Sequence, residues 1–563
     1  MKVVIVGGVA GGASAAARLR RLDEQAEIVV FERTGYVSYA NCGLPYFIGG
    51  VIEEEPALTL QSPEGFWNRF RIAVKTSHEV IAIHPDVHTV DVRDLLTGEE
   101  FVETYDKLIL SPGAHPIRPA LPGIDLDKIF SLRTVEDTLH IHGYVQEHEP
   151  RSAVVIGGGF IGVEAAENLR DLGLEVTLLQ RPGQLMNNLD YDMATLLHAE
   201  VREHGIDLRL RADVTGFEEA DGRVVTHVAG DDSIMADMVL LAIGVAPESH
   251  LAKKAGIELG IKGSIVVNDR METSAPDVYA VGDAVQVKHQ VTGEDAVISL
   301  AGPANKQGRI VADVICGLDS RYQGSLGSSV IKVFDLTAAS TGLSVKAARA
   351  AGIDYESVVL SPGSHAGYYP GATPMTMKVV FERETLRLLG AQIVGIDGVD
   401  KRIDVLATAI QAGIRADKLK DLDLAYAPPF SSAKDPVNMA GFMIENVGSG
   451  MLKQWHWEQE PDLPRDGSVQ LLDVRMVGEY DLGHIDGFVN IPVDDLRARL
   501  GELDVTKPVY VICQSGLRSY IGCRILAQYG FDCYNFSGGY RFFAAVTKDH
   551  RGSDNVMPCG LEK

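Results

Sequence analysis

The chain has 563 residues and a formal net charge of −25 at pH 7, with 46% hydrophobic and 23% charged residues. This length predicts about three to five domains, and the composition is that of a globular protein. The negative charge argues against nucleic acid or an anionic membrane surface as the main partner. No apolar run reaches the ~20 residues of a bilayer span, and the start MKVVIVGG lacks signal-peptide features. We therefore expect a cytoplasmic protein.

The six cysteines are too few and too scattered for a disulfide framework, and none forms a C-x-x-C pair, so we expect reduced thiols and no metal site. Four of them fit core packing or an exposed tail: Cys316, Cys523, Cys533 and Cys559. The remaining two, Cys42 and Cys513, stand in distinctive local sequences. Cys42 has no second cysteine near it in the sequence, so a redox partner for its thiol must come from the substrate.

Residues 2–32 read as strand, glycine turn, small-residue helix and second strand, the βαβ pattern of dinucleotide sites. Gly7, Gly8 and Gly12 let the backbone approach a pyrophosphate, and Glu32 at the end of the second strand is placed to bind a ribose hydroxyl. The middle position of the G-x-G-x-x-G fingerprint is occupied by Val9, so alone this unit is a moderate signal.

A second unit starts at residue 152, where Gly157, Gly159 and Gly162 match the fingerprint fully and Glu164 follows on the helix. The segment TSAPDVYAVGDA adds Asp283 at a glycine turn, where a carboxylate can bind the polyol of a flavin ribityl chain. Two such units in one chain indicate a flavoprotein that binds two dinucleotides. We predict FAD at the first unit and NAD(P)H at the second.

The motifs GGVAGGASAAAR, SYANCGLPY, YAVGDA, LAGPANKQGR and YAPPFSSAKDPVN resemble the single-cysteine branch of the pyridine nucleotide-disulfide oxidoreductases over residues 1–447. Within that branch the chain is most similar to coenzyme A disulfide reductases. The resemblance implies Cys42 as the redox centre, a homodimer, and Tyr426 reaching the partner subunit's active site. It also implies FAD contacts at Arg33 and Ala301.

The same resemblance implies a set of coenzyme A contacts, all of residue types that suit phosphate, amide or thiol groups. These residues are Ser14, Arg18, Arg21, Ser38, Asn41, Lys75, Tyr426 and Lys434. By composition alone, the arginines of the first helix favour a solvated helix face. A helix N-terminus and this nearby cationic cluster are expected to lower the pKa of Cys42.

NADH peroxidases and water-forming NADH oxidases share the scaffold and the lone cysteine. They carry a histidine near the flavin loop, where this chain has Ala10. An oxidase or peroxidase is therefore the less favoured alternative. For the nucleotide, Gln180 stands where a glutamate favours NADH and Arg181 beside it tolerates a 2′-phosphate, so NADH is preferred and NADPH remains open.

After a polar, proline-containing stretch, the segments LLDVR, EYDLGHIDGFVNIP and VYVICQSGLRS resemble a rhodanese domain. Cys513 ends an apolar strand and Arg518 closes the loop before a helix expected to begin near Ser519. Inward-facing backbone N–H groups and the helix dipole would stabilise a thiolate or persulfide at Cys513. The loop has the short length that suits sulfur chemistry.

The predicted fold class is α/β, with two Rossmann-like dinucleotide-binding domains, an α+β dimerisation domain and a C-terminal α/β rhodanese domain. The predicted boundaries are 1–112 and 246–324 for the FAD domain, 113–245 for the NAD(P)H domain, 325–447 for dimerisation, 448–465 for a linker and 466–563 for the rhodanese domain.

The combination predicts an NAD(P)H-dependent reductase of coenzyme A persulfide, polysulfide and coenzyme A disulfide, with Cys513 handling sulfane sulfur. The alternative is a plain coenzyme A disulfide reductase whose C-terminal domain is a sensor or scaffold.

Overall fold

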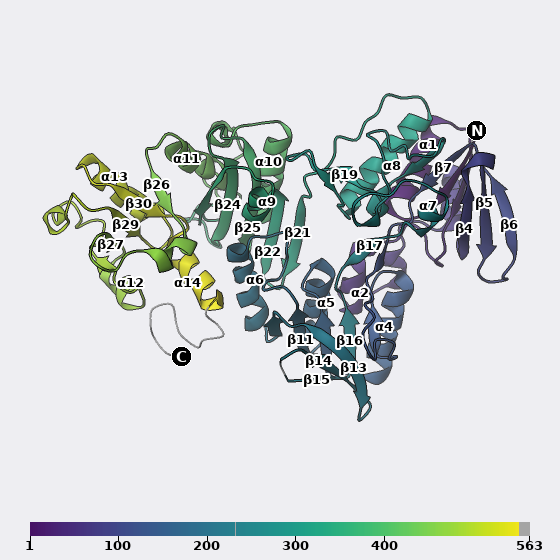
Figure 1. The fold of residues 1–563 in the computed structure, drawn as a ribbon, viewed down its shortest axis with the longest axis horizontal. Coiled ribbons are helices and arrows are strands. Elements are labelled where there is room, and N and C mark those ends of the chain that lie inside the picture. The colour runs from purple at the N-terminus through teal and green to yellow at the C-terminus, as the bar shows by residue number, and fades with distance from the viewer. Residues whose placement is uncertain (231, 551–563) are drawn as a thin grey trace. The chain divides into compact units, whose positions relative to one another are not determined.

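A computed structural model describes residues 1–230 and 232–550 (Figure 1). Cys559 lies outside the described residues. The chain divides into two compact units, of which the first comprises residues 1–185 and 205–327, and the second residues 186–204 and the chain from 328 onward. No described helix is long and apolar enough to cross a membrane. Each unit is described by itself.

The first sheet of unit 1 is parallel, with strand order β18-β7-β1-β2-β3. Its strands are β1 (Lys2–Val6), β2 (Glu27–Phe31), β3 (Ala73–Lys75), β7 (Lys107–Leu110) and β18 (Val278–Ala280). The run KVVIV is apolar throughout because both faces of a parallel sheet are covered. Helices α1 (Ala10–Leu22) and α8 (Ala301–Ile315) pack closely, since a Cβ on Gly308 would stand 2.3 Å from the Gly11 carbonyl oxygen.

The second parallel sheet of unit 1 has the order β12-β11-β10-β16-β9. Its strands are β9 (Ile129–Ser131), β10 (Ser152–Ile156), β11 (Glu175–Gln180), β12 (Asp207–Leu210) and β16 (Met238–Leu241). Helix α4 (Val135–His148) begins in a capping box at Thr134, and helix α5 (Phe160–Asp171) follows β10 directly. Both parallel sheets thus present a strand-to-helix turn where a dinucleotide can bind.

Antiparallel strands and short helices complete unit 1. One three-stranded sheet is formed by β4 (His78–His84), β5 (Thr89–Asp94) and β6 (Glu100–Thr104), and another by β13 (Val214–Ala220), β14 (Arg223–Val228) and β15 (Ile234–Ala236). Two-stranded pairs are β8 (Ala114–Pro116) with β17 (Val245–Pro247), and β19 (Val287–Lys288) with β20 (Asp295–Ala296). The helices are α2 (Leu44–Ile48), α3 (Pro63–Phe70) and α7 (His250–Lys254).

Unit 2 begins with an antiparallel sheet of order β21-β22-β25-β24-β23. The strands are β21 (Ser329–Val333), β22 (Leu336–Gly342), β23 (Tyr355–Leu360), β24 (Met375–Glu382) and β25 (Leu388–Gly395), and the helices of this part are α6 (Tyr191–Glu203), α9 (Val345–Ala350), α10 (Val399–Gln411) and α11 (Pro436–Gly448). Helices α10 and α11 bury their apolar faces in one core with β24 and β25. Helix α6 belongs to this unit, although the sequence assigned residues 113–245 to the nucleotide domain.

The C-terminal sheet of unit 2 is parallel, with order β26-β30-β29-β27-β28. Its strands are β26 (Lys453–Trp455), β27 (Gln470–Asp473), β28 (Val489–Asn490), β29 (Val509–Ile512) and β30 (Cys533–Phe536), and its helices are α12 (Val477–Asp481), α13 (Leu517–Gln528) and α14 (Gly539–His550). Helix α13 begins two residues earlier than the sequence suggested.

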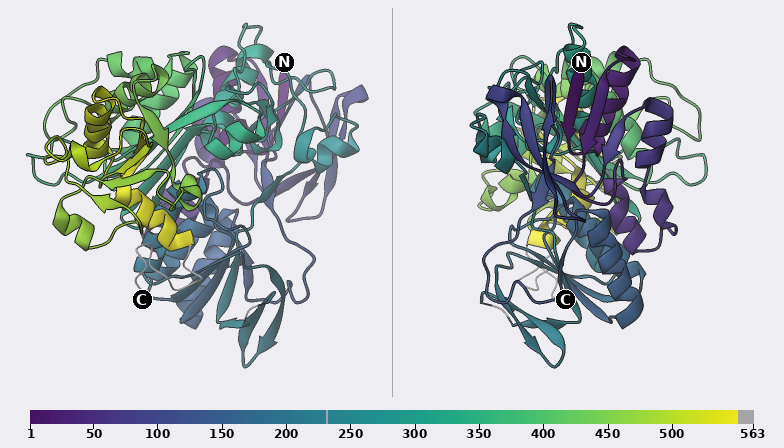
Figure 2. Two further views of the ribbon diagram at one scale, coloured as in Figure 1. Left: turned by 60° about the vertical axis from the view of Figure 1, so that its left-hand side comes forward. Right: turned by 90° about the vertical axis from the view of Figure 1, so that its right-hand side faces the viewer.

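The stretch 448–465 is folded, which corrects the expectation of a linker. Within it, β26 pairs with β30, and the Trp455 side chain is fully buried in the core of the C-terminal sheet. The C-terminal elements also lie beside the β21–β25 sheet, as the yellow-green and green segments of Figure 2 show. There the Val359 N–H donates to Ser537 Oγ over 2.9 Å in a buried position. This bond fixes the C-terminal sheet to the rest of unit 2.

Candidate functional site

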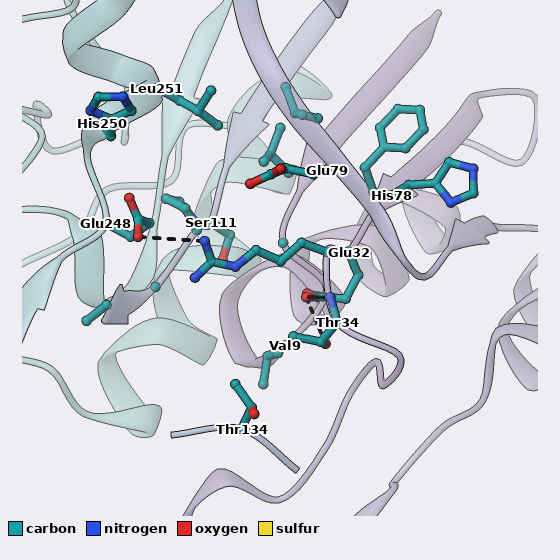
Figure 3. A pocket seen from close by; sticks show the side chains of 18 of the residues that line it. Val9, Glu32, Thr34, His78, Glu79, Ser111, Thr134, Glu248, His250 and Leu251 are labelled. Carbon is teal, nitrogen blue, oxygen red and sulfur yellow. Dashed lines mark hydrogen bonds and ion pairs between the residues drawn. The ribbon is translucent and has the colours of Figure 1, made fainter. Parts of the chain in front are cut away.

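A cavity of about 390 Å³ opens beside the first glycine loop of unit 1 (Figure 3). Gly7, Glu32 and Ser111 line one part of it, and other lining residues come from β4, from the segment 248–254, and from positions 41 and 133 near Cys42. Gly7 has φ +94°, and a Cβ there would stand 2.1 Å from the Ser111 carbonyl oxygen. Only glycine allows this close turn, which leaves the loop backbone free to approach a ligand.

Glu32 is buried and anchors the loop. Its carboxylate accepts from the Gly8 N–H at 2.8 Å and from the Thr34 N–H at 3.0 Å. Gly12 cannot carry a side chain, because a Cβ there would stand 1.9 Å from the Gly7 carbonyl oxygen. Arg33 lies 3.7 Å from Glu248, the pair joined by a dashed line in Figure 3. The donor set and the cavity fit the adenosine and pyrophosphate of FAD.

The second glycine loop repeats this construction. Gly157 has φ +117°, and a Cβ on Gly162 would stand 1.8 Å from the Gly157 carbonyl oxygen. Gly159 caps α5 in an extended conformation. Here Gln180 takes the place of Glu32, because its side-chain oxygen accepts from the Gly158 N–H at 3.0 Å. The end of β11 therefore carries no carboxylate that would repel a 2′-phosphate.

Cys42 lies in a short 3-10 turn, η1 (Asn41–Gly43), with its side chain exposed. In the amide orientation that satisfies both groups, Asn41 donates to the Arg133 carbonyl oxygen at 2.9 Å and accepts from Arg133 Nη1 at 3.2 Å. Arg133 also pairs with Asp283 at 2.8 Å, so it connects the cysteine turn to the glycine turn after β18. Ala301, another predicted flavin contact, is the first residue of α8.

The pKa of Cys42 is raised, contrary to the expectation from the sequence. Desolvation is the largest cause, the carboxylates of Glu164 and Asp283 add to it, and Arg133 alone opposes it. Glu164, which is partly buried, has a pKa raised to about 7 by desolvation, and it accepts from the Tyr46 hydroxyl at 3.5 Å. The surroundings of Cys42 in unit 1 are thus more acidic than the arginines of α1 suggested.

Six of the predicted coenzyme A contacts belong to unit 1, and several of them have partners within the protein. Ser14 hydrogen-bonds to Asn305, and Arg18 pairs with Asp313 at 2.7 Å. Lys75 lies over the Phe101 ring, 4.8 Å from its centroid. The remaining three are Arg21, Ser38 and Asn41. Arg21 is exposed and its Nε donates to the Ala17 carbonyl oxygen, Ser38 has a backbone φ of +51°, and Asn41 belongs to the cysteine turn.

The other two predicted contacts, Tyr426 and Lys434, belong to unit 2. The Tyr426 hydroxyl lies 2.6 Å from the Tyr368 hydroxyl, and this hydrogen bond raises the pKa of Tyr426. Both rings are exposed, Tyr368 by 75%. Sequence reasoning missed Tyr368, since it stands 58 residues before Tyr426 in a segment without a motif.

Arg402 holds the two tyrosine-bearing segments of unit 2 together. Its buried guanidinium donates to the Ser364 carbonyl oxygen at 2.9 Å, on the segment that leads to Tyr368. It also donates to the Phe430 carbonyl oxygen at 3.2 Å and to Asp435 Oδ2 at 3.1 Å, on the segment that follows Tyr426. The buried positive charge of Arg402 is therefore compensated by partners inside unit 2.

Cys513 is fully buried at the end of β29, and its sulfur is surrounded by donors. The Gly516 N–H donates to Sγ at 3.1 Å, and Ser519 Oγ lies 3.2 Å from Sγ. Ser519 Oγ is also 3.1 Å from the Gly516 carbonyl oxygen, and a negative sulfur is the stronger acceptor for its single proton. Ser519 was missed as a site residue, although it directly follows the quoted loop.

Arg518, predicted to close the loop, is the second residue of α13, and it is already paired. Its Nη1 and Nη2 contact the two carboxylate oxygens of Glu479 at 2.5 and 2.7 Å. This pair holds the pKa of Glu479 at about 2. Glu479, on α12, had no signal in the sequence beyond its place in the segment EYDLGHIDG.

Three family models match the chain. The model described as pyridine nucleotide-disulphide oxidoreductase matches residues 1–308, the dimerisation domain of the same family matches 328–436, and the rhodanese-like domain matches 460–545.

The chain is also similar to individual proteins. It is 39% identical over 447 residues to a coenzyme A disulfide reductase of Staphylococcus haemolyticus, which covers 79% of this chain and 100% of that protein. The crystal structure of reduced Bacillus anthracis CoADR-RHD is 48% identical with a TM-score of 0.95, covering 97% of this chain and 98% of that one. An NAD-dependent persulfide reductase from A. fulgidus is 37% identical with a TM-score of 0.90, covering 96% and 100%.

Proposed function

Because the chain belongs to the pyridine nucleotide-disulphide oxidoreductases, we propose that it reduces coenzyme A persulfide or polysulfide, and coenzyme A disulfide, with electrons from NAD(P)H. The family and the α/β fold class predicted from the sequence are confirmed, including the dimerisation and rhodanese domains. The proposed reaction is CoA–S–SH + NAD(P)H + H⁺ → CoA–SH + H₂S + NAD(P)⁺. With the disulfide, two CoA–SH are formed.

The family implies FAD and NAD(P)H as cofactors. Gly7, Gly8, Gly12 and Glu32 would hold the FAD pyrophosphate and ribose, and the loop from Gly157 to Gly162 would hold NAD(P)H. Bound FAD would accept hydride from NAD(P)H and return two electrons to a sulfur bond at Cys42. Since Gln180 is neutral and Arg181 is exposed beside it, the end of β11 admits the 2′-phosphate of NADPH. We infer a preference for NADH from the similarity to an NAD-dependent persulfide reductase.

Cys42 acts as the nucleophile. Its thiolate attacks the substrate sulfur bond, and the lone, exposed thiol leaves room for a large substrate. Desolvation and the carboxylates of Glu164 and Asp283 raise the pKa of Cys42, and the positive charge of Arg133 favours the thiolate. Arg133 reaches this position through Asn41 and Asp283.

The tyrosine pair completes the site from the partner subunit of a homodimer. The dimerisation domain supports two subunits, and the exposed, hydrogen-bonded hydroxyls of Tyr368 and Tyr426 are suited to donate to a leaving thiolate. Lys434, on the segment after Tyr426, adds a positive charge for the coenzyme A phosphates.

Two separate sulfur sites on one chain carry the persulfide proposal. An exposed Cys42 in unit 1 needs no second thiol if the substrate brings the redox partner, and Cys513 in unit 2 has donors that stabilise a persulfide anion. The similarity over nearly the full length to an NAD-dependent persulfide reductase supports the same reading. A chain restricted to disulfides would have no use for the Cys513 site.

A survey of acceptors with both nucleotides tests the proposal. We expect sulfide release from coenzyme A persulfide with a kcat/KM at least equal to that for coenzyme A disulfide. Turnover of the disulfide without sulfide release from the persulfide would favour the alternative, a disulfide reductase with a non-catalytic rhodanese domain.

Cys513→Ser separates the two functions further. It should spare reduction of small persulfides that enter the Cys42 site directly and impair sulfur donors that must first load Cys513. Equal loss with every acceptor would indicate a structural role for Cys513, and no loss would favour a sensor.

A further inference from the structure

Arg518, which follows the Cys513 loop, forms an ion pair with a carboxylate of the same chain. Arg518 and Glu479 form a two-contact ion pair, and with a pKa of about 2 Glu479 stays ionised at every pH at which the protein works. A second arginine, Arg475, forms an ion pair with Asp473 at 2.7 Å. It also donates a hydrogen bond to Oε1 of the loop residue Gln514 at 3.3 Å. Neither cation is left unpaired for an incoming anion.

Exposed apolar side chains stand next to the two residues of this ion pair in the sequence. They lie on α12, at its two ends and at the first position of α13, and their exposed fractions are high: Leu482 88%, Leu517 65%, Val477 56% and Met476 54%. Leu517 lies directly before Arg518, while Met476 and Val477 precede Glu479 on the same turn. The residue after Leu482, Gly483, has its carbonyl oxygen bound to Arg475 Nη2 at 2.7 Å. We call these four residues the apolar rim.

We propose that the Cys513 site takes sulfur from an organic persulfide whose carrier is uncharged next to the sulfur, and that the Glu479–Arg518 pair with the apolar rim excludes small dianionic donors such as thiosulfate. This proposal deepens the proposed function and rests on it for the role of Cys513 as a sulfur carrier. It names the donor class and the two features that select it.

The electrostatic part follows from charge balance. A dianion that approaches the Glu479–Arg518 pair loses hydration without gaining an unpaired cation from Arg518 or Arg475, and the Glu479 carboxylate repels it. An organic persulfide instead covers apolar side chains, which favours binding by about 25 cal/mol for each Å² buried. The ion pair therefore disfavours a dianion such as thiosulfate, and the apolar rim favours an organic persulfide.

The transfer step is balanced without an outside oxidant or reductant. The Cys513 thiolate attacks the terminal sulfur of R–S–SH, a Cys513–sulfur bond forms, and the donor S–S bond breaks. The electron pair of that bond leaves with R–S⁻, and the terminal sulfur keeps its proton. The product is the Cys513 persulfide, whose sulfur faces the Gly516 N–H and the Ser519 hydroxyl.

The test measures sulfur loading on Cys513 in the full-length Cys42→Ser chain without NAD(P)H. Reduced protein is mixed with thiosulfate or with pantetheine persulfide, an uncharged donor, and the gain of one sulfur atom on the Cys513 peptide is followed by mass spectrometry. We expect loading from pantetheine persulfide to be roughly 10-fold faster or more, in line with a charge effect of one to two kcal/mol. Equal rates would overturn the proposal.

Glu479→Gln isolates the charge. It should raise loading from thiosulfate roughly five- to ten-fold and leave pantetheine persulfide within about two-fold. A rise with both donors, or with neither, would overturn the role of Glu479.

Leu517→Ser isolates the rim. It should slow pantetheine persulfide several-fold and leave thiosulfate unchanged. Val505→Ser is the matched control, because Val505 is 51% exposed in the same domain but precedes the opposite end of β29. An equal effect of the two serine variants would overturn the rim. The proposed reductase function fails separately, by absence of sulfide release when NAD(P)H is present.

Discussion

Cys42 is exposed in a short turn where desolvation and two carboxylates raise its pKa, whereas Cys513 is fully buried with two hydrogen-bond donors around its sulfur. The Cys513 site is self-contained, since its donors and its closing arginine come from one loop and the next helix. The proposed Cys42 site is distributed, since the tyrosine pair belongs to unit 2. Under the proposed function, the carrier thiol is stabilised by local donors, while the thiol that meets the large substrate depends on distant segments.

The largest expected effect tests whether Cys42 is the only redox thiol. Cys42→Ser should lower reductase turnover by roughly 10³-fold or more, because no other thiol replaces the nucleophile. Bleaching of the flavin absorbance by NADH should remain. Cys316→Ser, at the end of α8, is the control and should retain activity. Substantial persulfide reduction by Cys42→Ser would mean that substrate reacts with the flavin directly.

The second prediction concerns the residue that holds the distributed site together. Arg402→Met should lower the free energy of unfolding by about 3 kcal/mol, because the buried Asp435 carboxylate keeps only the more distant, partly exposed Lys401 at 3.8 Å as a charge partner. Urea unfolding measures the loss. Adding Asp435→Asn should recover part of it, and a double variant no better than the single one would show that the packing of Arg402 matters more than its charge.

Hybrid dimers test whether the distributed site crosses subunits. Mixing Cys42→Ser with Tyr426→Phe chains, each inactive alone, should restore roughly a quarter of wild-type activity, because half of the dimers are mixed and each has one intact site. The measurement is turnover after subunit exchange, compared with each variant exchanged with itself. A fully active monomer by light scattering would contradict the arrangement.

Ser519→Ala tests the self-contained site. Loss of a hydrogen bond to a charged sulfur, worth about 1.5 kcal/mol, should slow sulfur loading on Cys513 roughly 10-fold. Ser515→Ala, exposed in the same loop, is the matched control. If the two variants behave alike, the Ser519 hydroxyl bonds to the Gly516 carbonyl oxygen instead of the sulfur.

The smallest expected effect concerns the charge around Cys42. Glu164→Gln removes a carboxylate that raises the pKa of Cys42, so alkylation of Cys42 at pH 7.5 should become a few-fold faster. Arg133→Gln removes the opposing charge and should make it slower. Peptide mass spectrometry measures both rates, with Cys316 as the internal control. The Glu164 effect should fade below pH 7, where its carboxyl is protonated.

The glycine loops and the Cys513 loop could be predicted because their requirements are local. A glycine at positive φ, a strand-end cysteine and a following helix are all encoded within a few residues. Predictions failed where distant groups decide the outcome. The carboxylates that raise the pKa of Cys42 lie on α5 and after β18, and Tyr368 meets Tyr426 only through the fold. Likewise, a polar stretch with prolines gave no sign that Trp455 would be buried.

The C-terminal sheet is hydrogen-bonded to strand β23 of the neighbouring sheet at Ser537–Val359 and Gln454–Ser357, and this contact has a kinetic consequence. A domain on a flexible tether would present its cysteine at an effective concentration averaged over the volume that the tether sweeps. Here Cys513 keeps one position relative to the dimerisation domain, so searching by the domain itself does not contribute to transfer. The distance that sulfur must travel from Cys513 is then covered by the molecule that carries it. This favours a small carrier with a long, flexible chain over movement of the whole domain.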